Sequence, residues 1–179
     1  MAKDQKQRGE NEYPICVYID PIIPAPFVES VKRGLRQWEE AFAEAGWTNV
    51  FRVSSSPEDA SLAYRTILVR WGAAFNGLYS SVVVNPENGE ILCARINLMD
   101  ASADEMLGTY FLQCGLLDER IRKDLHSLAV RQDVLTAQFA SAFAELLGMK
   151  PNRAGYTAFS PEALRSEKKL DKHGTTTSI

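Results

Sequence analysis

The segment Thr136–Asn152 (TAQFASAFAELLGMKPN) constrains the fold of this chain more than any other stretch. Apolar residues recur in and just before it at steps of four, four and three, at Leu135, Phe139, Phe143 and Leu146. This spacing places the side chains on one face of a helix, where they form a stripe that can be buried. Gly148 follows the last apolar position and Pro151 comes three residues later, as expected after a helix end. The segment therefore predicts a core helix of about four turns.

The same segment has the spacing of a zinc-protease motif but lacks its chemical groups. In His-Glu-x-x-His-x-x-Gly-x-x-His-Asn, two His share a helix face, a Gly lets the chain turn and a third His completes the site. The three ligand positions are occupied here by Ser141, Glu145 and Pro151. Ala142 stands at the position of the base Glu, and only Gly148 and Asn152 match the motif. Two matching residues do not identify a family, so the rest of the chain has to decide.

Length and charge exclude several function classes. A chain of 179 residues is expected to form one domain. A net charge of −3 argues against a nucleic-acid-binding protein, which would carry a basic face. No apolar run is long enough for a membrane span. Residues 1–12 are polar, are expected to be a disordered lead-in, and contain no apolar core of a signal peptide.

The three cysteines predict neither a disulfide framework nor a metal site. They are Cys16, Cys93 and Cys114, each in an apolar context and without Cys-x-x-Cys spacing. We expect free, buried thiols.

The chain up to residue 97 reads as strands around one long helix. The expected elements are a strand at Pro14–Ile19, a helix at Phe27–Ala45, strands at Val50–Ser54 and Arg65–Trp71, and a hairpin at Leu78–Asn97. The third strand is almost continuously apolar, which predicts a central place in the sheet. Asn88-Gly89 is a strong hairpin-turn signal.

The remainder of the chain is expected to be mainly helical. A helix is predicted at Ala103–Gln113, and the charged stretch Asp118–Asp133 is expected to lead directly into the main helix. An irregular segment and a short helix over 161–172 should follow. This order predicts an α+β (α/β-like) fold: a twisted mixed sheet with an antiparallel edge hairpin, packed on the long N-terminal helix and the main helix.

Several short strings support a family resemblance. They are, in chain order, Tyr18–Pro21 (YIDP), Trp38 with Ala41–Phe42 and Ala45–Trp47 (AGW), Leu68–Trp71 (LVRW), Ser81–Pro86 (SVVVNP) with Gly89–Leu92 (GEIL), and Tyr110–Gln113 (YFLQ). In this order and spacing the chain resembles bacterial zinc-dependent metalloproteases of the metzincin type. The resemblance implies one metallopeptidase domain over 13–179. It also implies that Ser178-Ile179 would begin the family's Ser-Ile-Met-Asp-Tyr turn, so that the Met of this turn and the C-terminal part of the fold would follow Ile179. Relatives are exported, whereas the localisation of this chain stays open.

The departures from the motif predict loss of the chemistry. A catalytic zinc of this type needs three imidazoles and a carboxylate base, and neither Ser141, Ala142 nor Pro151 supplies one. We therefore expect no zinc or other cofactor and an inactive pseudo-protease with a binding or structural role. An alternative is an active zinc peptidase that uses Glu145, His126 and His173. The two His are, however, expected to be solvated surface side chains.

A third hypothesis is a peptide-binding interaction module. The resemblance implies that the edge strand near the former site, at about Leu78–Val84, binds an extended peptide by strand addition, which needs no metal. The candidate residues are Tyr79, Ser81, Val82 and Val83. The alternative for this segment, which we favour from the sequence alone, is an edge strand protected by its loops with no binding role.

Overall fold

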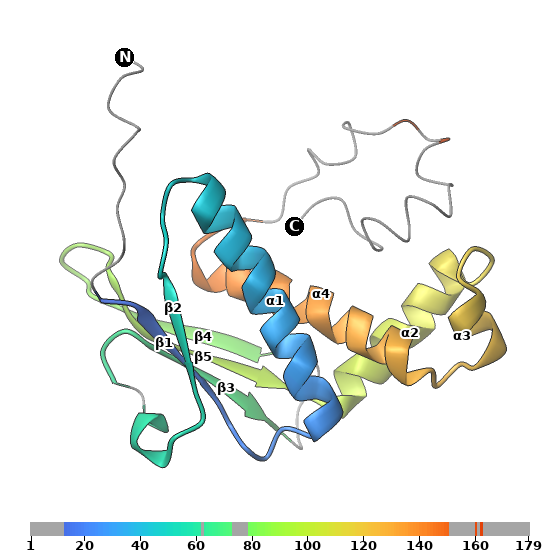
Figure 1. Ribbon diagram of the computed structural model, residues 1–179, viewed down its shortest axis with the longest axis horizontal. Helices are drawn as coiled ribbons and strands as arrows, with labels where there is room; N and C mark the ends of the chain where they lie inside the picture. Colours follow the sequence, from blue (N-terminus) through green and yellow to red (C-terminus); the bar gives the residue numbers. More distant parts are fainter. Residues whose placement is uncertain (1–12, 62, 73–78, 151–159, 161, 163–179) are drawn as a thin grey trace.

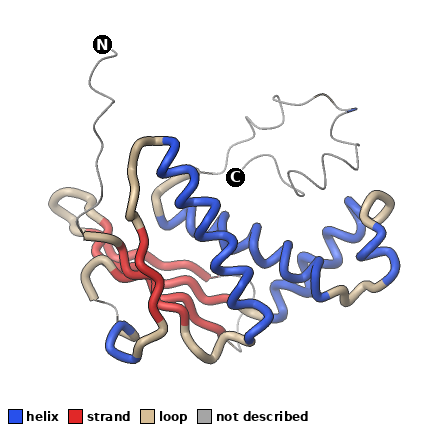
Figure 2. The backbone as a smooth tube through the Cα atoms, viewed as in Figure 1, coloured by secondary structure: helices blue, strands red, loops and turns tan. Residues whose placement is uncertain are grey.

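The computed structural model describes residues 13–61, 63–72 and 79–150, together with residues 160 and 162. Within this part of the chain, a five-stranded sheet carries helices on one of its faces (Figures 1 and 2). The elements are β1 (Ile15–Ile19), α1 (Ala25–Glu44), β2 (Phe51–Ser54), the 3₁₀ helix η1 (Pro57–Asp59), β3 (Thr66–Trp71), β4 (Tyr79–Val84), β5 (Ile91–Leu98), α2 (Asp100–Cys114), α3 (Glu119–Lys123) and α4 (Leu128–Leu146). The predicted lead-in and the predicted short helix over 161–172 lie outside the described residues, apart from residue 162.

The sheet is mixed, with its strands in the order β2-β1-β3-β5-β4. Strands β2, β1, β3 and β5 are parallel, and β4 alone is antiparallel and forms one edge. Strand β3 occupies the centre, as its apolar sequence predicts. The Asn88-Gly89 turn joins β4 to β5, and Gly89 adopts a φ of +74°, which few residues other than glycine adopt readily. The prediction of an α+β fold with a mixed sheet and an antiparallel edge hairpin is confirmed.

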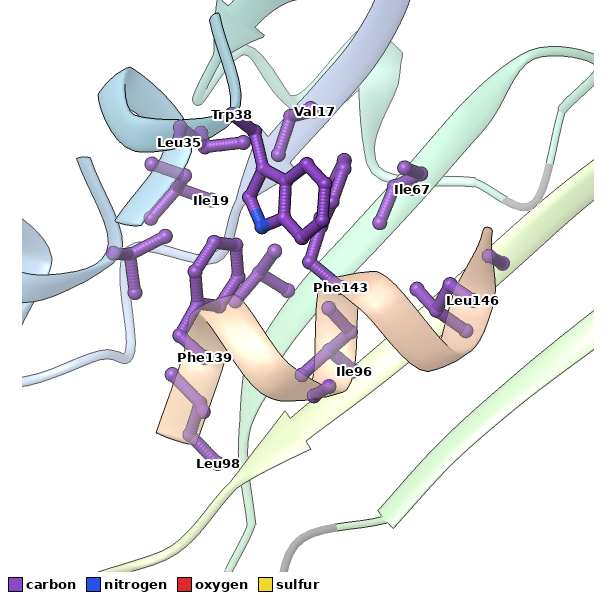
Figure 3. Packing of buried hydrophobic residues seen from close by; sticks show 14 of the residues in the cluster. Val17, Ile19, Leu35, Trp38, Ile67, Ile96, Leu98, Phe139, Phe143 and Leu146 are labelled. Carbon is purple, nitrogen blue, oxygen red and sulfur yellow. The ribbon is translucent and has the colours of Figure 1, made fainter. Parts of the chain in front are cut away.

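Helices α1 and α4 form the main core with the inner face of the sheet (Figure 3). Val17 and Ile19 from β1, Ile67 and Val69 from β3, and Ala94, Ile96 and Leu98 from β5 contribute to that face. The predicted stripe of α4 is buried in this core. The ring of Phe143 lies 5.8 Å from that of Trp38 and 5.2 Å from that of Phe51, measured between centroids. Aromatic packing thus joins α4 to α1 and to β2.

Helices α1 and α4 approach closely at Gly34. A Cβ atom placed at this position would lie 2.6 Å from Cδ1 of Phe139, so only glycine fits without a shift of the ring. Trp38 donates its indole N–H to the carbonyl of Ala140 at 3.1 Å, which fixes the two helices further along. The long N-terminal helix therefore packs directly on the helix that carries the degenerate motif.

The charged stretch Asp118–Asp133 leads into the main helix as predicted, since α4 begins within it, but its first part forms a separate helix that was not predicted. This helix is α3, whose N-terminus is capped by Asp118 through the N–H of Arg120 at 2.9 Å. The backbone is extended at Asp124, and α4 then begins at Leu128. The sequence pattern does not reveal this break. Its charged side chains pair with charges on other helices and do not mark one solvent-exposed helix face.

Candidate functional site

The C-terminal end of α4 is closed by the glycine of the motif. Gly148 has a φ of +77°, and its N–H donates to the carbonyl of Glu145 at 2.9 Å. The N–H of Met149 donates to the carbonyl of Ala144 at 3.0 Å. These two bonds make a Schellman motif, so Gly148 ends the helix as predicted. Pro151 and Asn152 lie outside the described residues.

The remaining motif positions divide between the surface and the core. Ser141 and Glu145 are exposed and stand one helical turn apart on one face of α4. Ala142 is 1% exposed and belongs to the main core. A carboxylate at this buried position would lose most of its hydration. The two exposed positions therefore present a hydroxyl and a carboxylate to solvent, and the alanine at the motif's base position supplies no base.

The other proposed zinc ligand in the described part of the chain lies far from Glu145. His126 is exposed in the link between α3 and α4, where its backbone N–H donates to Asp124 at 2.9 Å. Glu145 stands 17 residues beyond the first residue of α4, a helical rise of about 26 Å. One metal ion cannot bridge that distance. Among the described residues no group of three or more His, Cys, Asp or Glu could hold a metal, and His173 lies outside them.

Two of the three cysteines are poor candidates for a catalytic nucleophile. All three are free thiols: Cys16 is buried, and Cys93 and Cys114 are half-buried. Burial raises the pKa of Cys114, and the nearby charge of Asp118 raises it further. Burial likewise raises the pKa of Cys16. Because the thiolate is the reactive form, both groups are poor nucleophiles at neutral pH.

Strand β4, which carries the predicted peptide-binding residues, forms one edge of the sheet. On one side it pairs with β5, from Tyr79 opposite Asn97 to Val84 opposite Ile91, with a register shift between its last two residues. No other described strand pairs with it. Ser81 is half-buried, while Val82, Val83 and Val84 are 42%, 50% and 47% exposed. Helix α4 contacts β4 as well as β5, so the edge lies next to the helix with the degenerate motif.

Arg95 was missed by the sequence analysis. It lies on β5 directly opposite Ser81, on the face of the sheet turned away from the helices. The available signal is a charged residue between two core positions, Ala94 and Ile96. Its neighbourhood depends on strand order, which the local sequence pattern does not reveal.

Comparisons of this chain with protein-family models, with curated proteins and with solved structures find no match. The resemblance to metzincin-type metalloproteases therefore stays a prediction from the sequence strings.

Proposed function

We propose that this chain is a catalytically inactive, metallopeptidase-like domain that binds an extended peptide by strand addition to β4. The main support is the antiparallel edge strand β4, whose outer side pairs with no other strand in the described part of the chain and which carries three exposed valines next to α4. An edge strand offers unpaired N–H and C=O groups to another chain, and main-chain hydrogen bonds then supply the affinity. This mode of binding needs no metal.

The proposed lack of catalytic activity is supported by the side chains at the motif positions of α4. The ligand positions hold Ser141 and Glu145, and the base position is a buried alanine. The alternative of an active peptidase with unusual ligands has little support, because His126 and Glu145 are too far apart to share a zinc ion.

The sequence alone favours an edge strand without a binding role. The exposure of the β4 side chains is the stronger argument, and it favours binding. Natural edge strands are commonly blunted by charges, prolines or covering loops. Residues 82–84 are all valine, and about half of each side chain is exposed. An apolar edge of this kind is suited to another strand.

The test is selection of a displayed library of random twelve-residue peptides on the wild-type domain and on Val83→Lys. A lysine on the edge should repel an added strand while leaving the β4–β5 pairing intact. The matched control is Val53→Lys on β2, the opposite edge of the sheet, where the valine is 44% exposed.

We expect peptides that bind the wild type and Val53→Lys equally and that lose at least tenfold in affinity for Val83→Lys. Equal loss in both variants, or no peptide enriched on the wild type, would refute strand addition at β4. Melting curves of all three proteins establish that each is folded.

A further inference from the structure

The face of the sheet turned away from the helices, here called the outer face, carries two neighbouring arginines. Arg70 of β3 lies opposite Asn97, and Arg95 of β5 lies opposite Leu68. Residues paired directly across strands share a face, and the residues between them, Val69 and Ile96, belong to the core. Arg70 and Arg95 are therefore diagonal neighbours on the outer face.

The two arginines differ in their partners. The guanidinium of Arg70 lies 3.7 Å from the carboxylate of Asp20. Arg95 makes no side-chain hydrogen bond or ion pair in the described part of the chain. The Nε of both arginines is buried without a hydrogen-bond acceptor. A guanidinium is always charged and carries five donors, and a buried donor without an acceptor is unfavourable. Arg95 is thus the arginine of the pair that has no acidic partner among the described residues.

Arg95 lies one strand away from the open edge. Its neighbour across β4 is Ser81, a small side chain on the same face. A peptide added to β4 would lie two strand spacings from the backbone of Arg95, about 9.5 Å. The long arginine side chain can cross the small Ser81 and meet a side chain reaching back from the added strand. Its neighbours Leu68, Cys93 and Asn97 are neutral, and its charged neighbour Arg70 is paired with Asp20.

We propose that the peptide bound at β4 carries an aspartate or glutamate opposite Ser81 and that Arg95 binds this carboxylate. The inference rests on the proposed strand addition and adds the charge preference of that site. Charge complementarity supports it: the acceptor that Arg95 lacks is the group that an acidic residue would supply. A lysine at the same peptide position would place two cations together and would be disfavoured.

The test uses the peptides selected on the wild-type domain. We expect the aligned sequences to be enriched in Asp or Glu at one position, and the corresponding Glu→Gln peptide to bind about fivefold more weakly, as for a partly exposed ion pair. With Arg95→Gln, the Glu and Gln peptides should bind equally, at the affinity of the Gln peptide for the wild type. Arg95→Lys should restore part of the difference. The wild-type difference should also shrink as salt is raised.

The matched control is Arg52→Gln, on the same face but at the far edge strand β2. It should leave the Glu preference unchanged. Enriched peptides without an acidic position, a preference that survives Arg95→Gln, or a preference that Arg52→Gln also abolishes would each overturn this inference while leaving strand addition intact. Failure of Val83→Lys to weaken binding would instead overturn the proposed function, and this inference with it.

Discussion

The two halves of α4 are held in place by different kinds of interaction. The C-terminal half packs by aromatic contact: Phe139 and Phe143 are fully buried against each other, and Phe143 also packs against Trp38. The N-terminal half packs through Val130 and Val134 in a second apolar cluster with α2 and α3 and is also held by ion pairs. Asp133 accepts from Arg33 of α1 at 2.8 Å and from Arg120 of α3 at 2.9 Å.

The ion pairs of the N-terminal half are connected to a buried carboxylate, that of Asp118. Arg120 also donates to both carboxylate oxygens of Asp118, at 3.1 and 2.8 Å. Buried Tyr110 of α2 donates its hydroxyl to the same carboxylate at 2.7 Å. This network connects α1, α2, α3 and α4. It consists of Tyr110, Asp118, Arg120, Asp133 and Arg33.

The comparison shows that neither half of α4 depends on a metal ligand. The positions that align with the zinc-protease motif lie in the C-terminal half, where Ala142 belongs to the main core. The polar network lies at the other end of the helix, beside a second apolar cluster that joins α2, α3 and α4. Apolar packing and ion pairs of this kind need no metal ion.

The largest expected effect comes from Phe143→Ala. The ring contacts Trp38, Phe51 and Phe139, and its removal leaves a cavity, which should lower the free energy of unfolding by about 3–5 kcal/mol. Ser141→Ala, two residues away but exposed, should change it by less than about 0.5 kcal/mol. Urea unfolding measures both. Similar values for the two variants would show that the aromatic packing does not support this half of α4.

The next effect comes from Asp118→Asn, which removes the charge at the centre of the polar network. The free energy of unfolding should fall by about 2 kcal/mol, because Arg120 and Tyr110 lose their shared acceptor. The control is Glu119→Gln, whose exposed pair with Lys123 should matter little. Equal loss in both variants would contradict a special role for the buried carboxylate.

The network also predicts acid sensitivity. The hydrogen bonds from Arg120, aided by Tyr110, lower the pKa of Asp118 from 3.8 to about 2. A carboxylate with a lowered pKa stabilises the folded state fully above its unfolded pKa, and this contribution is lost as the pH falls. The difference in unfolding free energy between the wild type and Asp118→Asn should therefore be constant from pH 7 to 5 and shrink by about 2 kcal/mol between pH 5 and 2. A difference that does not change with pH would contradict this assignment.

The smallest effect on stability is expected for the double variant Ser141→His with Glu145→His. Both positions are exposed, so the unfolding free energy without metal should change by less than about 0.5 kcal/mol. Two His at i and i+4 should, however, create a zinc site that raises the melting temperature when zinc is added. Ser141→His alone should show a much smaller rise. If added zinc does not change the melting temperature of the double variant, the two positions do not lie on one helix face in a way that lets both bind zinc.

The fold was predictable wherever a local pattern sets the structure. The stripe of α4, the apolar run of β3 and the Asn88-Gly89 turn each produced the predicted element. The break before α4 was not predictable, because Asp118 and Asp133 find partners on other helices and so look like ordinary surface charges in the sequence.

The candidate site was predictable in part. The positions of Ser141, Ala142 and Glu145 on one helix followed from periodicity, and the edge strand followed from the Asn88-Gly89 hairpin signal and the order of the elements. The place of Arg95 behind Ser81 depends on strand order and register, which are long-range properties. Its unpaired state could only be recognised from the three-dimensional structure.

The central claim is that the domain folds without a bound metal ion, and its most direct test is the metal content of the wild-type protein. The protein is purified without chelator and its metal content is measured by mass spectrometry. Its melting temperature is measured with and without added zinc. We expect no stoichiometric zinc and a melting temperature that added zinc does not change. One tightly held zinc ion per chain, with a melting temperature that falls on chelation, would contradict it.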